Sequence, residues 1–111
     1  MKFSSQIKRR ALIDTGSCAN ALPESLFSDL NLINPKSLTL EKPLFNSVRM
    51  ASGQRFPVDE QAKITFQIGP HFFQDSFLIL PTMNSVILGN PFSKNTILQS
   101  IQKTNYYNYQ I

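Results

Sequence analysis

The sequence predicts an all-β domain with one or two short helices. Apolar residues alternate with polar ones over residues 62–68, which is the pattern of a strand with one buried face. Turn-forming glycines and prolines bound several short apolar runs, and residues 23–30 have the apolar spacing of a short helix. The chain of 111 residues, 41% of them hydrophobic and 16% charged, is long enough for one globular domain with its own core.

In the first half of the chain we expect three strands and one helix. Residues 3–7 and 10–14 are predicted as strands joined by a turn of three basic residues. Residues 17–21 are small and polar, which favours a loop. The helix follows, with Pro23 near its first position, and a short strand is expected at residues 38–40.

The second half is predicted as a series of hairpins followed by a short helix and a last strand. Gly53 lies in a tight connection and supplies the positive φ angle that such a turn needs. His71, the only histidine, falls in another turn and is expected to be a surface residue. The predicted strands are residues 46–50, 54–58, 62–68, 72–80, 86–88 and 96–101, and the helix is residues 90–95.

The composition excludes several kinds of site. Cys18 is the only cysteine, so no internal disulfide and no cysteine-based zinc site is possible, and one histidine excludes a histidine-rich metal site. No apolar run is long enough to span a membrane, and the N-terminus lacks a signal-peptide core. We therefore expect a cytoplasmic domain with no metal, no other cofactor and no membrane partner. The net charge is +4, but the basic residues are scattered apart from Lys8, Arg9 and Arg10, so no direct nucleic-acid contact is expected.

The chemistry of the chain is predicted to centre on Asp14. Three apolar residues precede it, and Thr15 and Gly16 follow it at once. A carboxylate at the end of a buried strand is costly unless it is hydrogen-bonded or shares a proton, and enzymes use such sites for acid–base chemistry. The triplet alone is weak evidence, because a motif this short also arises by chance.

Two further motifs give the triplet a family context. Residues 11–17 (ALIDTGS), 50–53 (MASG) and 86–92 (VILGNPF), in this order and spacing, resemble the retropepsin family, the aspartic proteases of retroviruses and LTR retrotransposons. The resemblance extends over residues 7–101. It implies a closed β-barrel subunit with residues 1–102 as the protease domain and residues 103–111 as a polar tail. It also implies an aspartic endopeptidase that processes a Gag-Pol-type polyprotein in the cytoplasm or within virus-like particles.

The sequence supports a homodimer independently of the family. An aspartic protease needs two adjacent carboxyl groups that share one proton, because two like charges in contact cannot both ionise cheaply. No second Asp-[Ser/Thr]-Gly occurs, and neither Asp59 nor Asp75 is followed by glycine. The second carboxylate is therefore expected from Asp14 of another copy. Such a pair would activate water for attack on a peptide bond, with a bell-shaped, acid-leaning pH profile.

The resemblance implies a role for each motif residue. Thr15 would grip the partner's loop across the dimer interface, and Gly16 would contact the substrate backbone. Ser17 stands where retroviral members commonly carry alanine, and we expect its hydroxyl to donate to Asp14, favour the ionised carboxylate and shift activity to lower pH. The flap that closes over the substrate would comprise Met50, Ala51, Ser52 and Gly53, and the support beneath the Asp14 loop would comprise Ile87, Leu88 and Gly89. The substrate peptide would bind as an extended strand, with large apolar residues on either side of the cleaved bond.

Departures from the family pattern leave other functions open. Cys18, expected to be a small packed residue, and Asn90 stand where retroviral members carry an acid and a base that pair. Few residues precede Asp14 in this sequence, so we expect either a dimer that relies on contacts other than the family's N-terminal strand, or a sequence that begins inside a longer polyprotein. The alternatives are a dimerisation or binding module of retropepsin type without activity, and a basic RNA-binding β-domain. Residues 50–53 also fit an ordinary hairpin turn.

Overall fold

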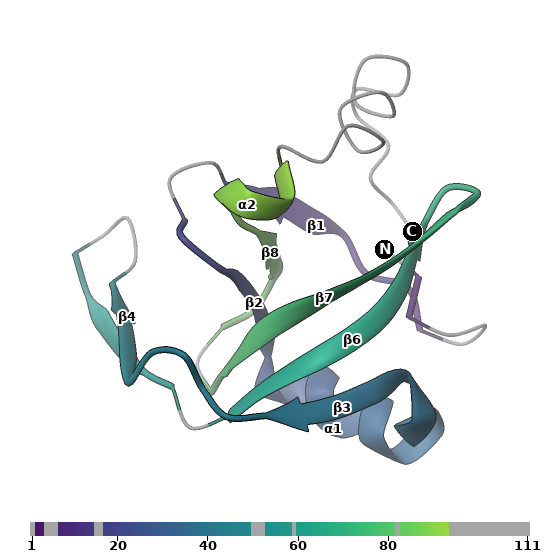
Figure 1. Cartoon of the computed structure of the whole chain (residues 1–111), viewed down its shortest axis with the longest axis horizontal. Coiled ribbons are helices and arrows are strands. Elements are labelled where there is room, and N and C mark those ends of the chain that lie inside the picture. The colour runs from purple at the N-terminus through teal and green to yellow at the C-terminus, as the bar shows by residue number, and fades with distance from the viewer. Residues whose placement is uncertain are drawn as a thin grey trace.

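The structure is mostly β, with one mixed sheet of six strands and a separate two-stranded ribbon (Figure 1). This computed structural model describes residues 2–3, 7–14, 17–49, 53–58, 60–81 and 83–93. The strands are β1 (Ala11–Ile13), β2 (Asn20–Pro23), β3 (Leu38–Glu41), β4 (Ser47–Arg49), β5 (Arg55–Pro57), β6 (Glu60–Ile68), β7 (His71–Leu80) and β8 (Val86–Leu88). The helices are α1 (Glu24–Ile33), the short 3-10 helix η1 (Pro35–Ser37) and α2 (Asn90–Ser93). The predicted all-β class with short helices is confirmed at this level.

The longest pairing joins β6 and β7 into one antiparallel hairpin. Their register runs from Glu60 opposite Ile79 to Ile68 opposite His71. Gly69 has a φ angle of 57°, which permits the tight turn between the two strands. The predicted alternating strand is therefore confirmed. His71 is exposed, as expected, but it begins β7 and does not lie in the turn.

Strands from the first and second halves of the chain lie side by side in the sheet. The strand order is β1-β8-β2-β7-β6-β3. β2 runs parallel to β7, with Ala21 opposite Leu78, and antiparallel to β8, with Ala21 opposite Ile87. β1 runs parallel to β8, with Ile13 opposite Leu88. Because β1 and β8 are parallel and in this register, the residues that follow the two strands lie side by side.

The basic turn predicted near the N-terminus is wrong. Lys8 forms an antiparallel bridge with Lys2, and the N–H of Phe3 donates to the C=O of Ile7 at 2.9 Å, so the chain has already reversed before Lys8. Lys2 also exchanges two backbone hydrogen bonds of 2.8 Å with Gln67 of β6. Buried Phe3 and Ile7 place the reversal where they can join the core, which a charge pattern does not reveal. The N-terminal segment thus leads from β6 back towards β1.

The predicted helix is confirmed, and the loop predicted before it is shorter than expected. β2 already begins at Asn20, so residues 17–21 are not all loop. The buried Asn20 amide is hydrogen-bonded within the fold, which allows a polar residue to enter the sheet. Pro23 is the N-cap of α1, and Leu26 and Leu30 face the core one turn apart.

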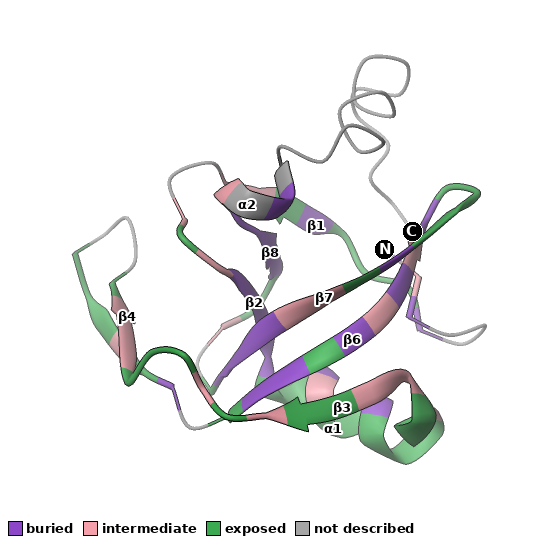
Figure 2. Ribbon diagram, in the orientation of Figure 1, coloured by how far each residue is buried: buried purple, intermediate pink, exposed green. Residues whose placement is uncertain are grey.

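The core is built around phenylalanine rings. Phe66 of β6 is 1% exposed, and its ring centroid lies 5.5 Å from those of Phe77 and Phe92. The ring of Phe3 lies 6.2 Å away on the N-terminal segment. Tilted and edge-on aromatic pairs of this kind bury a large apolar area, and here they hold the N-terminal segment, the β6–β7 hairpin and α2 together. Figure 2 shows that buried residues line β2, β8 and one end of β7.

A second apolar cluster joins the β4–β5 ribbon to the sheet. Val48 and Phe56, which lie opposite each other in the ribbon, pack against this cluster. Its buried members are Ala21, Val58, Leu78, Leu80 and Ile87. Gly53 has a φ angle of 86°, as predicted for this connection. The strands predicted at residues 38–40, 46–50, 54–58 and 86–88 are present as β3, β4, β5 and β8.

Some predictions fall outside the described residues. These are the last strand at residues 96–101, the domain boundary at residue 102 and the polar tail at residues 103–111. Of the helix predicted at residues 90–95, α2 covers Asn90–Ser93. In the part of the chain that is described, no helix has the length and apolar character needed to cross a membrane.

Candidate functional site

Asp14 directly follows β1 and lies where β1 and β8 both end. Its backbone N–H donates to the C=O of Leu88 at 2.9 Å, which continues the pairing of the two strands. Its C=O accepts from the N–H of Ser17 at 3.1 Å, so the chain turns back on itself at once. Asp14 is half-buried in the single chain. The strand predicted to end in this acid is present, and the pairing places the acid next to the segment that follows β8.

Ser17 holds the loop after Asp14 in shape. Its Oγ donates to the C=O of Ala19 at 2.7 Å, and its own C=O accepts from the N–H of Asn90 at 2.8 Å. A serine hydroxyl has a single proton to donate, and that proton is already engaged. The predicted hydrogen bond from Ser17 to the Asp14 carboxylate is therefore wrong. The hydroxyl stabilises the loop after Asp14, and the hydrogen bond from the N–H of Asn90 to the C=O of Ser17 stabilises the same loop.

Gly89 lies in close contact with the same loop. A Cβ atom at this position would lie 2.5 Å from the backbone oxygen of Ala19 and 3.0 Å from that of Ser17. Any side chain would therefore collide with backbone atoms that no rotamer change can move. Glycine is needed at residue 89 because of this approach and not because of its own φ angle.

Asn20 is the functional residue that sequence reasoning missed. Its Oδ1 accepts from the N–H of Gly89 at 2.9 Å, and its Nδ2 donates to the C=O of Ser76 at 3.1 Å. The side chain thus joins the segment after β8 to the edge of β7 from within the sheet. The one signal in the sequence is an amide among the small residues before the helix.

A pocket lies between this loop and the ribbon. Its volume is about 90 Å³, and it is mostly apolar apart from Arg49 at the end of β4. Its lining residues are Ser17, Cys18, Ala19, Ala21, Val48, Arg49, Leu78, Leu80 and Ile87. The pocket is therefore bounded by the loop after Asp14 on one side and by the base of the predicted flap on the other. Of the predicted support residues, Ile87 lines it and Leu88 is fully buried behind it.

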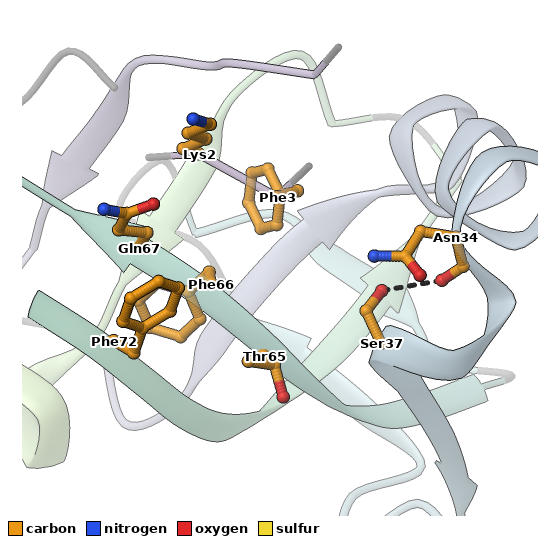
Figure 3. Close-up of a pocket in the computed structure, with 8 residues that line it drawn as sticks. All are labelled: Lys2, Phe3, Asn34, Ser37, Thr65, Phe66, Gln67 and Phe72. Atoms are coloured by element: carbon orange, nitrogen blue, oxygen red, sulfur yellow. Dashed lines mark hydrogen bonds between the residues drawn. The ribbon is translucent and has the colours of Figure 1, made fainter. Parts of the chain in front are cut away.

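Two other pockets lie elsewhere on the molecule. The nearer one, of about 190 Å³, shares Cys18, Ala19 and Leu78 with the first pocket and continues to Leu44 and Asp75. Cys18 is exposed, so the expectation that it is packed is wrong. The farther pocket, of about 300 Å³, lies between the N-terminal segment, η1 and β6 (Figure 3). It is lined by Lys2, Phe3, Asn34, Ser37, Thr65, Phe66, Gln67 and Phe72, none of which was predicted as a site residue.

Several predicted site residues lie outside the described residues, and their roles stay predictions. These are Thr15 and Gly16 of the loop and Met50, Ala51 and Ser52 of the predicted flap. Gly53, the remaining flap residue, is exposed at the start of the returning strand.

Comparisons with protein-family models, curated proteins and solved structures gave no match to this chain. The chemistry therefore has to be inferred from the residues themselves. None of the residues that line the pocket beneath the ribbon is acidic, and among the described residues no three histidine, cysteine, aspartate or glutamate side chains are grouped to hold a metal ion. Asp14 itself is not among the residues that line this pocket; the pocket is lined by Ser17, Cys18 and Ala19 from the loop that follows it.

Proposed function

We propose that this chain is one subunit of a homodimeric aspartic endopeptidase of retropepsin type. The observation that carries the proposal is the fit between the Asp14 loop and the segment after β8. Asp14 is bonded to Leu88, and its loop lies against Gly89 with no room for a side chain. This fit fixes the backbone on both sides of Asp14, which is what a catalytic acid requires.

The pocket between the loop and the ribbon supports a peptide substrate. Its apolar walls suit a large apolar side chain, and the ribbon above it is a hairpin that can cover an extended peptide. Leu12 lies on the edge strand β1, two positions before Asp14, and its large apolar side chain is 56% exposed. We infer that substrate or the second subunit covers this side chain in the active enzyme. The substrate that the resemblance implies is a polyprotein processed in the cytoplasm or in virus-like particles.

The second subunit supplies the missing carboxylate in this proposal. Asp14 of each copy would approach the other across a two-fold axis, with the loops joined through Thr15. The closed barrel that the family implies is supported by the N-terminal segment, because Lys2 pairs with both Lys8 and Gln67. Through these bridges the chain before β1 reaches β6 on the far side of the sheet.

The reaction follows from one shared proton on the two carboxyl groups. The ionised Asp14 removes a proton from a water molecule, and the water oxygen attacks the carbonyl carbon of the peptide bond. The protonated Asp14 of the partner donates its proton to the carbonyl oxygen. A proton then passes from the first carboxyl group to the leaving nitrogen, while the partner carboxylate takes back a hydroxyl proton from the tetrahedral intermediate. The C–N bond breaks to give a carboxylic acid and an amine, and the pair again holds one shared proton. Gly16 would allow the substrate backbone to approach closely.

The proposal is tested by peptide cleavage with a matched pair of variants. Purified protein is incubated at high concentration with peptides that carry large apolar residues on both sides of one bond, between pH 4 and pH 7. Asp14→Asn should lower the rate by at least about 10²-fold, the usual contribution of a general acid or base. Asp29→Asn, which removes an exposed acid from α1, should leave the rate unchanged.

Protein concentration separates the proposal from its alternative. Activity per mole of chain should rise with concentration, because only the dimer has two carboxylates. Cleavage that persists in Asp14→Asn would overturn the proposal. Absence of cleavage at every pH would also overturn it, and sedimentation of the same samples as a dimer would then favour the binding module without activity.

A further inference from the structure

A chain of side-chain hydrogen bonds connects the sheet to the segment that enters the ribbon. Glu41, the last residue of β3, accepts through one carboxylate oxygen from the Oγ of Ser76 at 2.6 Å and from the Nε2 of Gln61 at 3.1 Å. The Oε1 of Gln61 in turn accepts from the backbone N–H of Leu44 at 3.0 Å. Gln61 is only 4% exposed, so water does not readily replace either partner.

Leu44 marks the point where the chain leaves the sheet for the ribbon. The segment between β3 and β4 passes through Leu44, and the N–H of Val58 donates to the C=O of Asn46 at 2.9 Å to close the base of the ribbon (Figure 1). Between β3 and this base, the Gln61 amide is the side chain that holds the backbone to β6. The direction in which the ribbon extends from the sheet therefore depends on Gln61 as well as on the apolar cluster beneath the ribbon, and Gln61 is in turn hydrogen-bonded to Glu41.

We propose that Glu41 is a positioning residue for the ribbon, acting through Gln61 on Leu44, and that loss of its charge loosens the ribbon at acid pH. The ribbon's task as a flap over substrate rests on the proposed function, but the hydrogen-bond relay does not. Ionised acceptors form bonds roughly twice as strong as neutral ones, so protonation weakens both bonds that Glu41 accepts. The buried Gln61 amide is then held less firmly, and so is the Leu44 N–H.

The groups around Glu41 set the pH at which its carboxylate loses its charge. The hydrogen bond from Ser76, and then that from Gln61, lower the pKa of Glu41; burial opposes them to a smaller extent, and the charge of Lys63 on β6 makes the smallest contribution, which also lowers the pKa. The other charged neighbours are Lys42 next in the chain, Glu60 on β6 and Asp75 on β7. Because the pKa is lower in the folded chain, the relay stabilises the fold above the ordinary glutamate pKa of about 4.3 and loses this effect as the pH falls further.

The direct test is amide hydrogen exchange of the full chain, read by NMR and corrected for intrinsic rates. At pH 6.5, Glu41→Gln should speed exchange of the Leu44 N–H by about fivefold, since charge accounts for about half of such a bond. Glu41→Ala, which removes the acceptor, should speed it by about tenfold or more. Glu60→Gln is the matched control, because it removes an exposed charge next to Gln61, and should stay within about twofold.

The pH dependence provides the second measurement. Wild-type exchange at Leu44 should approach that of Glu41→Gln as the pH falls below about 4, while the variant itself should show no such change. Equal exchange in Glu41→Gln and wild type at pH 6.5 would overturn the proposal, and so would a wild-type pH response that survives in the variant. Unchanged exchange at Ile64, in the middle of β6, verifies that the variants are folded. If Glu41→Ala does not fold, Ser76→Ala removes one donor and should give an intermediate effect.

Peptide cleavage distinguishes failure of this proposal from failure of the protease proposal. If wild type cleaves peptides, Glu41→Gln should raise KM at pH 6.5 while kcat stays within about twofold, because a loosened flap weakens binding more than it alters the carboxylate pair. Cleavage without any response at the Leu44 amide would overturn the relay and leave the protease proposal standing. Faster amide exchange at Leu44 in Glu41→Gln, in a chain that cleaves no peptide, would overturn the protease proposal and leave the relay standing.

Discussion

Replacing Gly89 with alanine should damage both the stability of the fold and the proposed activity. The added Cβ would lie 2.5 Å from the backbone oxygen of Ala19, 2.7 Å from its backbone carbon and 3.0 Å from the backbone oxygen of Ser17. All three contacts are to backbone, so the clash cannot be relieved by a change of rotamer. The loop that follows Asp14 has to move instead.

The magnitude follows from the contacts that the movement disturbs. Overpacking by one methyl group costs about 1–3 kcal/mol. A shifted loop also strains the bonds from Asn90 to Ser17 and from Gly89 to Asn20, and a typical hydrogen bond contributes about 1 kcal/mol net. We therefore expect the free energy of unfolding to fall by about 2–4 kcal/mol. For a chain of this length that corresponds to a Tm lower by about 10–20 °C.

Urea and thermal unfolding followed by circular dichroism measure this loss, with Gly69→Ala as the control. Gly69 has a φ angle of 57° and no atom within 4 Å of its added Cβ, so alanine there costs only the left-handed backbone strain, about 1–2 kcal/mol. Below both midpoints, Gly89→Ala should also cleave peptides about 10²-fold more slowly, because a displacement near 1 Å misplaces the carboxylate. An unfolding free energy for Gly89→Ala no lower than that for Gly69→Ala would refute the steric argument.

Two further substitutions test the interior of the sheet. Asn20→Ala leaves the N–H of Gly89 and the C=O of Ser76 without their buried partner and should cost about 2–4 kcal/mol in urea unfolding; a loss below about 0.5 kcal/mol would contradict this. Phe66→Ala, in the centre of the aromatic cluster, should cost about 3–5 kcal/mol. Phe72→Ala, at a residue that is 72% exposed, should cost under about 0.5 kcal/mol, and similar losses for the two would contradict the assigned core.

Local patterns predicted most of the strands because they are local properties of the chain. The alternation over residues 62–68 reflects one buried and one outward face, and β6 follows it residue by residue. Gly53 was predictable because its turn requires a positive φ angle. Pro23 and the leucines after it predicted α1 for the same kind of reason. Each of these signals acts within a few residues.

The failures concern residues whose conformation is decided by distant partners. Asn20 enters a strand because Gly89 and Ser76, far along the chain, satisfy its amide. The basic residues before β1 do not form the turn, because Lys2 bridges both Lys8 and Gln67 and the chain has therefore reversed direction before Lys8. In the candidate site, the strand ending in Asp14 was predictable from its apolar run. The hydrogen bond from the Ser17 hydroxyl to Ala19 was not predictable, because it depends on the shape of the loop.

Ser76 joins the two polar clusters of this molecule. Its C=O accepts from Asn20, which holds Gly89 beside the Asp14 loop, and its Oγ donates to Glu41, which holds Gln61. Side-chain hydrogen bonds thus link Gly89, which lies against the Asp14 loop, through Ser76 of β7 to the segment that enters the ribbon. In the proposed protease, a catalytic acid and a flap would have to be placed correctly relative to each other before substrate arrives, and bonding both to one strand would achieve this. A buried amide lowers the stability of the fold unless each of its polar groups has a hydrogen-bond partner. We infer that Asn20 and Gln61 serve to position the loop and the ribbon, and not only to stabilise the fold.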